Sequence, residues 1–283
     1  INNVLDKLAE MGFKNLTLAA SSLSAVHAPL IEHIRSGLIT HIETSGLRGE
    51  LAEQISRGLM DFPVVFRSHG GRASAIRSGE LHIDVAFLGA PSCDPYGNAN
   101  GYSRDDDDGI SCGSLGYART DAEFADKVII ITNNIVSYPN APWAIPEHDV
   151  DYVVRVDDIG DPKGIMSGAT RYTKDPKELL IAKTAANVVE AAGYLYDGFS
   201  MQMGSGGASL ATARFIRQKM LDKGIRCRFA LGGITGQITA MHEEGLIDRI
   251  LDVQSFDLDA AKSLKNNHFH HQISATYYAS HLV

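Results

Sequence analysis

Short apolar runs alternate with helical patterns along the chain. Apolar residues at positions 1, 4, 5, 8 and 11 have the spacing of one helix face, and Gly12 ends that element. Ser24 is expected to cap a second helix, which ends at Gly37 and carries Val26, Leu30, Ile31 and Ile34. Further helical segments lie near residues 51–59 and 73–77. Strand-length apolar runs lie at residues 16–20, 38–42, 64–66, 83–88, 128–131 and 151–156. The alternation predicts an α/β fold, with mostly parallel sheets covered by helices.

A second unit is expected to begin near residue 175. Asp175, Pro176 and Glu178 stand in the order of an N-cap, a proline at the first helical position and an acid in the first turn. The helix that they start runs to residue 193, and a glycine loop, a helix and strands near residues 227–231 and 250–253 follow. Residues 157–174 are rich in Gly, Asp and Lys, which is typical of a domain boundary. We therefore expect one α/β domain over residues 1–165 and a second over residues 175–283.

Two short segments of the chain resemble each other. GLITHI at residues 37–42 and GLIDRI at residues 245–250 share four of six positions, and each follows a helix that itself follows a strand. Chance similarity is the alternative, because helix–glycine–strand junctions are common in such folds. If the two segments are related, the glycine loop at Gly204 has its first-domain counterpart just before Ile1. We then expect a fragment of a longer protein, with an incomplete second domain.

Composition and charge limit the class of protein and the kinds of partner that this chain can have. A chain of 283 residues with 44% hydrophobic residues can bury a sizeable core, which excludes disordered and disulfide-scaffold proteins. The net charge of −8, without a basic run, argues against nucleic acid or a membrane surface as partner. The longest nearly uncharged stretch, residues 128–145, contains Asn and Pro and does not resemble a membrane span. Three cysteines without a C-x-x-C pair indicate reduced thiols in a cytoplasmic protein.

Two clusters of polar residues are candidates for a metal site. The run Asp105, Asp106, Asp107 and Asp108 points its carboxylates in different directions, as solvated loops do. His268, His270 and His271 include an i, i+2 pair, but no third ligand stands at metal spacing. We predict no metal site.

The glycine loop GSGGA at residues 204–208 is the strongest candidate for chemistry. It stands directly before a predicted helix, where backbone N–H groups can bind an anion or a developing oxyanion. It is neither a dinucleotide fingerprint nor a P-loop, because Ser209 replaces the third glycine and no Lys follows. A tight strand–helix turn is the alternative interpretation.

Three polar loops follow predicted strands. They span residues 45–49, 68–72 and 94–98, and the first two each carry an arginine suited to a carboxylate or phosphate. Surface charge is the favoured interpretation of each arginine on its own, and turn chemistry alone explains Asp94 to Asn98. No G-x-S-x-G, H-E-x-x-H or Ser–His–Asp signature occurs, so acyl chemistry would have to use loops and the substrate's own carboxylate.

Taken together, these loops resemble a known family. The motifs are DVAFLGA at 84–90 with Asp94 and GN at 97–98, SGLRG at 45–49, HGGR at 69–72, CGSLGYA at 112–118, DGFS at 197–200, GSGGASLA at 204–211, LGGITG at 231–236 and DVQSFD at 252–257. In this order and over essentially the whole chain, they are similar to the alpha chains of citrate lyase, in the coenzyme A transferase superfamily.

The resemblance implies two tandem coenzyme A transferase-type domains, the second apparently truncated, and an activity. The family exchanges the acetyl group on an acyl carrier protein for citrate, through a mixed anhydride and without a glutamyl intermediate. It holds no permanent cofactor, because the coenzyme A-like thioester arm of the carrier is the co-substrate. Its partners are the carrier (gamma) and lyase (beta) subunits, in an oligomeric cytoplasmic complex.

The resemblance also assigns residues. The glycine loop takes the catalytic role as the oxyanion site, with Gly204, Ser205, Gly206, Gly207 and Ala208. Substrate binding is expected at Arg48, His69, Gly70, Gly71, Arg72, Asn98, Gly232 and Gly233. Residues 103–110 look inserted relative to the family pattern, and family chains are longer at both ends, which leaves the activity of this chain alone open. The alternatives are an acetate or citramalate coenzyme A transferase and a non-catalytic metabolite-binding domain.

Overall fold

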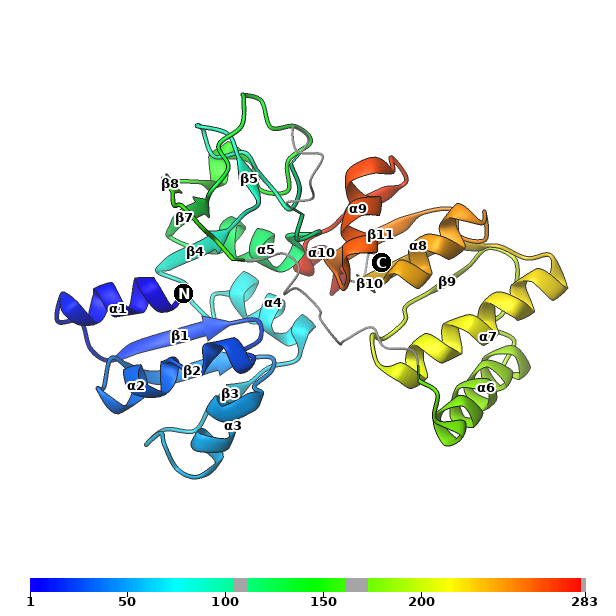
Figure 1. Cartoon of the computed structure of the whole chain (residues 1–283), viewed down its shortest axis with the longest axis horizontal. Coiled ribbons are helices and arrows are strands. Elements are labelled where there is room, and N and C mark those ends of the chain that lie inside the picture. Colours follow the sequence, from blue (N-terminus) through cyan, green and yellow to red (C-terminus); the bar gives the residue numbers. More distant parts are fainter. Residues whose placement is uncertain (104–110, 161–172, 281–283) are drawn as a thin grey trace. The chain divides into compact units, whose positions relative to one another are not determined.

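The computed structural model describes residues 1–103, 111–160 and 173–280 (Figure 1). The chain separates into two compact units, Ile1–Asp84 and Val85–Val283, which we call unit 1 and unit 2 and describe separately. The predicted domain boundary between residues 165 and 175 is a different division and stays a prediction. Most of the segment expected to form the boundary, residues 157–174, lies outside the described residues, because residues 161–172 are not described, and neither is the four-aspartate run.

Unit 1 is a small parallel sheet with its connecting helices. The strands lie in the order β1-β2-β3, and both pairings are parallel. Buried Leu23, Leu30, Ile42 and Leu51 belong to its core. The elements are α1 (Asn2–Glu10), β1 (Leu16–Ala20), α2 (Leu30–Arg35), β2 (Ile39–Thr44), α3 (Gly49–Ser56), β3 (Val65–Phe66) and α4 (His69–Ser78).

The predicted helix after Ser24 is interrupted. The structure has a 3₁₀ turn at Ala25–His27, with Ser24 as its N-cap, and then the separate helix α2. Pro29 stands between them and has no N–H to continue the hydrogen-bond ladder. As a result Val26 does not share the buried side of α2, and 73% of it is exposed.

Unit 2 begins with a second parallel sheet. The strands lie in the order β4-β7-β8, and the short hairpin β5–β6 and helix α5 accompany them. Alternate residues of β4 and β7 are buried, among them Leu88, Val128 and Ile130. The elements are β4 (Val85–Gly89), β5 (Ser92–Cys93), β6 (Ala99–Asn100), α5 (Gly116–Phe124), β7 (Lys127–Thr132) and β8 (Tyr152–Arg155).

The rest of unit 2 contains a four-stranded sheet in the order β12-β11-β10-β9, and all three pairings are parallel. The two parallel sheets of unit 2 and the parallel sheet of unit 1, beside the antiparallel pair β5–β6, confirm the predicted α/β fold with mostly parallel sheets. The elements are α6 (Pro176–Ala191), β9 (Phe199–Met201), α7 (Gly207–Lys223), β10 (Cys227–Ile234), α8 (Gly236–Glu243), β11 (Ile250–Ser255), α9 (Leu258–Asn266), β12 (His270–Gln272) and α10 (Ala275–Tyr278).

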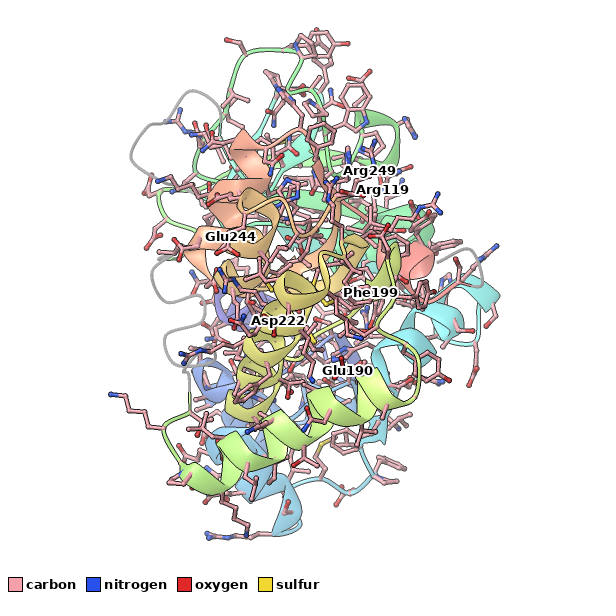
Figure 2. The ribbon with its side chains drawn as sticks, turned by 90° about the vertical axis from the view of Figure 1, so that its right-hand side faces the viewer. Arg119, Glu190, Phe199, Asp222, Glu244 and Arg249 are labelled. Atoms are coloured by element: carbon pink, nitrogen blue, oxygen red, sulfur yellow. The ribbon has the colours of Figure 1, made fainter. Side chains whose placement is uncertain are left out.

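Helices α6 and α7 pack side by side (Figure 2). The Asp175 carboxylate accepts a hydrogen bond from the Lys177 N–H at 2.9 Å, which confirms the predicted N-cap of α6. Near the other end of α6, Glu190 forms ion pairs with Lys219 and Lys223 of α7. Within the described residues, no helix combines the length and apolar composition that a bilayer crossing requires.

The two similar segments of the sequence form the same local structure. Gly37 follows α2 and Gly245 follows α8, with φ of 74° and 76°. The next residue in each copy donates its N–H back to a helix carbonyl: Leu38 to His33, and Leu246 to Met241, both at 3.0 Å. A strand parallel to the preceding one then follows in both cases. The same pattern recurs at α7, where Gly224 has φ 63°, the Ile225 N–H donates to the Met220 carbonyl at 3.1 Å, and β10 follows parallel to β9. The similarity thus marks a strand–helix–strand junction that is not confined to the two similar segments.

Candidate functional site

The predicted catalytic loop, residues 204–208, connects β9 to α7. Gly206 is the N-cap of α7, with φ −69° and ψ 156°, and among the described residues no side chain caps this helix end. The first N–H groups of a helix lack acceptors within the helix, and the helix dipole makes this end positive. A Cβ added at Gly206 would meet no described atom within 4 Å, so there is open space beside the loop. The loop can therefore offer N–H groups to an anion or an oxyanion.

Gly232 and Gly233 lie near the end of β10, the strand beside β9. A Cβ at Gly232 would lie 3.1 Å from the Gln202 side chain, and a Cβ at Gly233 would overlap the ring of Phe256. Both glycines therefore make room for side chains that follow the neighbouring strands. The carboxyl ends of parallel strands meet at one sheet edge, where α/β proteins bind ligands. The structure thus brings Gly232 and Gly233 to the edge that carries the loop at residues 204–208, while the catalytic role of that loop and the contact of the two glycines with substrate stay predictions.

Asp94 organises the turn that precedes β6. Its Oδ1 accepts hydrogen bonds from the N–H groups of Tyr96, Gly97 and Asn98, at 3.0–3.1 Å. Its Oδ2 accepts from the Asn98 side chain at 2.8 Å and from the Asn140 N–H at 3.0 Å. Burial opposes the charge, but these hydrogen bonds outweigh it and lower the pKa of Asp94. The carboxylate is thus a structural anion within the protein.

Asn98, a predicted substrate ligand, is 2% exposed. Its Nδ2 donates to Asp94 and to Glu147 Oε2 at 2.9 Å, and its Oδ1 accepts from the Glu147 N–H at 2.9 Å. Both ends of the amide are therefore engaged within the protein. The structure gives Asn98 a role in joining two loops, and its contact with substrate stays a prediction.

The remaining predicted substrate ligands lie in unit 1. Arg48 is the N-cap of α3, directly after the loop that follows β2, and it is exposed. His69, Gly70, Gly71 and Arg72 form the first turn of α4, after β3, and the Ser68 hydroxyl caps this helix by accepting from Gly71 N–H at 2.9 Å. Because β2 and β3 are neighbouring parallel strands, Arg48 and the first turn of α4 share one edge of the sheet. Arg72 is 4% exposed, so it is a largely buried guanidinium.

A buried polar cluster around Asp252 was not predicted. Asp252 is fully buried, and its Oδ2 lies 2.6 Å from Ser255 Oγ and 3.1 Å from His270 Nε2. Its Oδ1 has no hydrogen-bond partner in the described part of the chain. Burial raises the pKa of Asp252, against the opposing effect of the hydrogen bond with His270. His270 Nδ1 lies 3.0 Å from Ser263 Oγ, so this histidine is held between α9 and β11.

The CGSLGYA motif packs against the same cluster. Ser114 donates its hydroxyl to the Asp252 carbonyl at 2.7 Å and its N–H to Ser255 Oγ at 3.1 Å. A Cβ at Gly113 would overlap the Ser255 side chain, and one at Gly116 would overlap the Val253 carbonyl. Glycine is therefore required for this close approach of two backbones. The motif joins α5 to the end of β11.

The three cysteines are poor candidates for a catalytic nucleophile. Cys93, Cys112 and Cys227 are free thiols, and burial raises the pKa of each to about 12. They are protonated at neutral pH and are poor nucleophiles.

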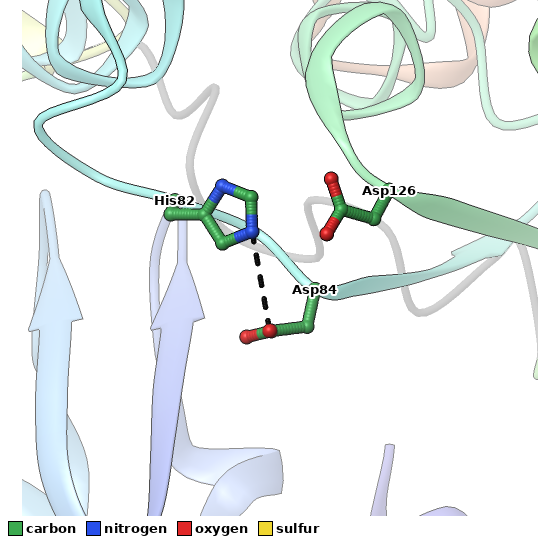
Figure 3. A group of neighbouring side chains, drawn as sticks. All are labelled: His82, Asp84 and Asp126. Atoms are coloured by element: carbon green, nitrogen blue, oxygen red, sulfur yellow. Dashed lines mark ion pairs between the residues drawn. The ribbon is translucent and has the colours of Figure 1, made fainter.

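At the end of unit 1, His82 Nε2 lies 3.9 Å from Asp84 Oδ1 (Figure 3). Both side chains are more than half exposed, so this pair contributes little to stability.

Comparisons with known proteins give a consistent result. The profile of the family "Citrate lyase, alpha subunit" matches residues 1–282. The citrate lyase alpha chain of Haemophilus influenzae is 57% identical over 281 residues, which cover 99% of this chain and 55% of that protein. The chain spans about half the length of the curated relatives it matches.

Two solved structures are also similar to this chain. A Streptococcus mutans protein described as a citrate lyase alpha subunit, crystallised in complex with citrate, has a TM-score of 0.93 and 55% identity over 100% of this chain and 55% of that one. The 4-hydroxybutyrate CoA-transferase of Porphyromonas gingivalis, at 15% identity, has a TM-score of 0.56 over 96% of this chain and 67% of that one. The second similarity concerns the fold alone.

Proposed function

The chain belongs to the citrate lyase alpha subunit family, and we propose that it takes part in an acyl transfer. In this reaction citrate replaces the acetyl group on the thiol of an acyl carrier protein, giving the citryl thioester and acetate. The observation that carries the proposal is the similarity, over the whole chain, to a protein crystallised with citrate. The open glycine loop before α7 supports it, because thioester chemistry needs donors for an oxyanion.

The proposed reaction uses the substrates' own groups. A citrate carboxylate attacks the acetyl carbonyl, the thiolate leaves, and a mixed acetyl–citryl anhydride forms. The thiolate then attacks the citryl carbonyl, and acetate leaves. Each attack passes through an oxyanion, which the N–H groups near Gly206 can stabilise by about 3–4 kcal/mol per well-placed donor. The three protonated cysteines, of which Cys93 and Cys227 are buried, agree with a route that uses no thiolate of the protein.

Binding of a tricarboxylate requires cations. Arg48 and Arg72, which share one sheet edge in unit 1, are suited to bidentate contact with carboxylates. We assign them to citrate together with His69, Gly70 and Gly71, and we assign Asn98, Gly232 and Gly233 to the substrate in unit 2. The acyl-thioester arm of the carrier is the proposed co-substrate. The carrier and lyase subunits are the proposed partners, in an oligomeric cytoplasmic complex.

The proposal is tested by a product assay. The chain is incubated with acetyl-coenzyme A, as a mimic of the carrier arm, and citrate, and citryl-coenzyme A is followed by mass spectrometry. The full-length citrate lyase alpha chain of Escherichia coli is the positive control. We expect citryl-coenzyme A from both proteins. Product from the control alone would show that this chain does not carry out the transfer by itself.

A further inference from the structure

One side-chain hydrogen bond joins a helix distant in sequence to the residue two positions before the predicted catalytic loop. The Tyr278 hydroxyl, at the end of α10, donates to Gln202 Oε1 at 2.9 Å. Gln202 is the first residue after β9 and stands two residues before Gly204. The direction in which the chain leaves β9 is therefore coupled to the position of α10.

Helix α10 is in turn attached to α5. Ser274 caps α10 by accepting from the Tyr277 N–H at 3.1 Å, and Ala275 is buried. The Thr276 N–H donates to the hydroxyl of Thr120, a buried residue of α5, at 3.2 Å. The Tyr278 hydroxyl is thus placed by a short helix that is attached to α5, from the earlier part of unit 2.

The Gln202 side chain also lies beside β10, although the residue is exposed. Its Cδ and Nε2 would both be 3.1 Å from a Cβ at Gly232, so a side chain there would crowd it. Gly232 has φ 96°, a conformation that favours glycine, so the strand is shaped to leave this space. The Gln202 side chain is therefore placed beside Gly232, and its amide oxygen accepts the hydrogen bond from Tyr278.

We propose that Gln202 and Tyr278 are positioning residues for the loop at residues 204–208. They set the direction of its N–H groups relative to α5, which Ser114 fastens to the end of β11. Neither side chain needs to touch the reacting atoms. The inference rests on the proposed function in so far as the loop stabilises an oxyanion.

The kinetic test uses Tyr278→Phe, which keeps the ring and removes the hydroxyl. Misplaced oxyanion donors stabilise the transition state less well, but they do not change the binding of the thioester in its ground state. We expect kcat for citryl-coenzyme A formation to fall about tenfold, with an unchanged KM for acetyl-coenzyme A. Tyr277→Phe, on the same helix and 42% exposed, is the matched control and should behave as wild type.

A second variant separates positioning from general damage to the fold. Gln202→Met keeps the length of the side chain and removes the acceptor, and it should lower kcat as Tyr278→Phe does. Because both variants break one hydrogen bond, the double variant should lose no more than either single variant. Independent, multiplying losses would overturn the proposal, as would an unchanged kcat in Tyr278→Phe.

A third readout does not depend on activity. Hydrogen exchange is compared in wild type, Tyr278→Phe and Tyr277→Phe at the amides that begin with Leu210, whose N–H donates to the Gly206 carbonyl of the loop at 2.9 Å. We expect exchange about tenfold faster in Tyr278→Phe alone, with unchanged global stability. Equal exchange in all three proteins would overturn the positioning role. If wild type forms no citryl-coenzyme A, the proposed transfer fails, and hydrogen exchange alone then decides whether Tyr278 orders the loop.

Discussion

At the scale of single residues, two buried aspartates have opposite electrostatic environments. Asp94 receives five hydrogen bonds from N–H groups, which together outweigh burial and lower its pKa, whereas burial dominates at Asp252 and raises its pKa. The two residues therefore affect stability in opposite directions as pH changes.

Replacing Asp94 should destabilise the protein most at neutral pH. Asp94→Asn removes acceptor capacity for buried N–H groups, and we expect the free energy of unfolding to fall by about 2–4 kcal/mol. Because the pKa of Asp94 is lowered on folding, its ionised form stabilises the protein fully at pH values above 3.8. This stabilisation is lost as the pH falls through the folded-state pKa. Denaturant unfolding should thus show a smaller difference in acid. Asp84→Asn, with its side chain 89% exposed, is the control, and an equal loss there would contradict the account.

Asp252→Asn should show the reverse dependence on pH. The raised pKa of Asp252 means that the wild type is most stable while this carboxyl is protonated, and that stability is lost as pH rises from 3.8 through the folded-state pKa. Asn does not titrate, so the variant should gain stability relative to wild type as the pH rises above 3.8 towards the raised folded-state pKa. Chemical unfolding across that range measures the difference. A constant difference would show that the pKa of Asp252 is not raised by burial.

At the scale of elements, the N-cap of α6 forms as the sequence predicts. Asp175→Ala should remove the N-cap of α6 and lower the free energy of unfolding by about 1 kcal/mol. Lys183→Ala, at an exposed position in the same helix, is the control, and it should change stability by less than about 0.5 kcal/mol. Thermal or chemical unfolding of both variants checks this. Equal effects would mean that the Asp175 side chain does not act as a cap.

Elements with strong apolar patterns were predictable, and those with weak patterns were not. The strand at Leu16–Ala20 and the helix α7 follow directly from their apolar spacing. Helix α5 was missed because its buried residues are Gly116, Thr120 and Ala122, which give no apolar stripe. Strand β12 was missed for a related reason, because its buried residue is the polar His270, which is stabilised by Asp252. Only the tertiary partners explain such elements.

At the scale of the whole molecule, the candidate site was predictable in part. The glycine loop was recognisable because several glycines precede a helix, and the structure places it at a sheet edge beside Gly232. Asn98 looked like a ligand from its motif, yet its amide is engaged with Asp94 and Glu147. The Asp252 cluster and the Tyr278–Gln202 bond had no local signal, because each joins residues from separate elements.

The central claim is that the glycine loop before α7 carries an acyl transfer between acetyl and citryl thioesters. The most direct measurement compares citryl-coenzyme A formation by wild type, Gly206→Leu and Gly89→Leu. A side chain at either glycine would meet no described atom within 4 Å at its Cβ, so both variants should fold. We predict that Gly206→Leu slows product formation by about 100-fold or more, because its side chain fills the space beside the N–H groups, while Gly89→Leu retains the wild-type rate. A wild-type rate in Gly206→Leu would contradict the assignment of the loop.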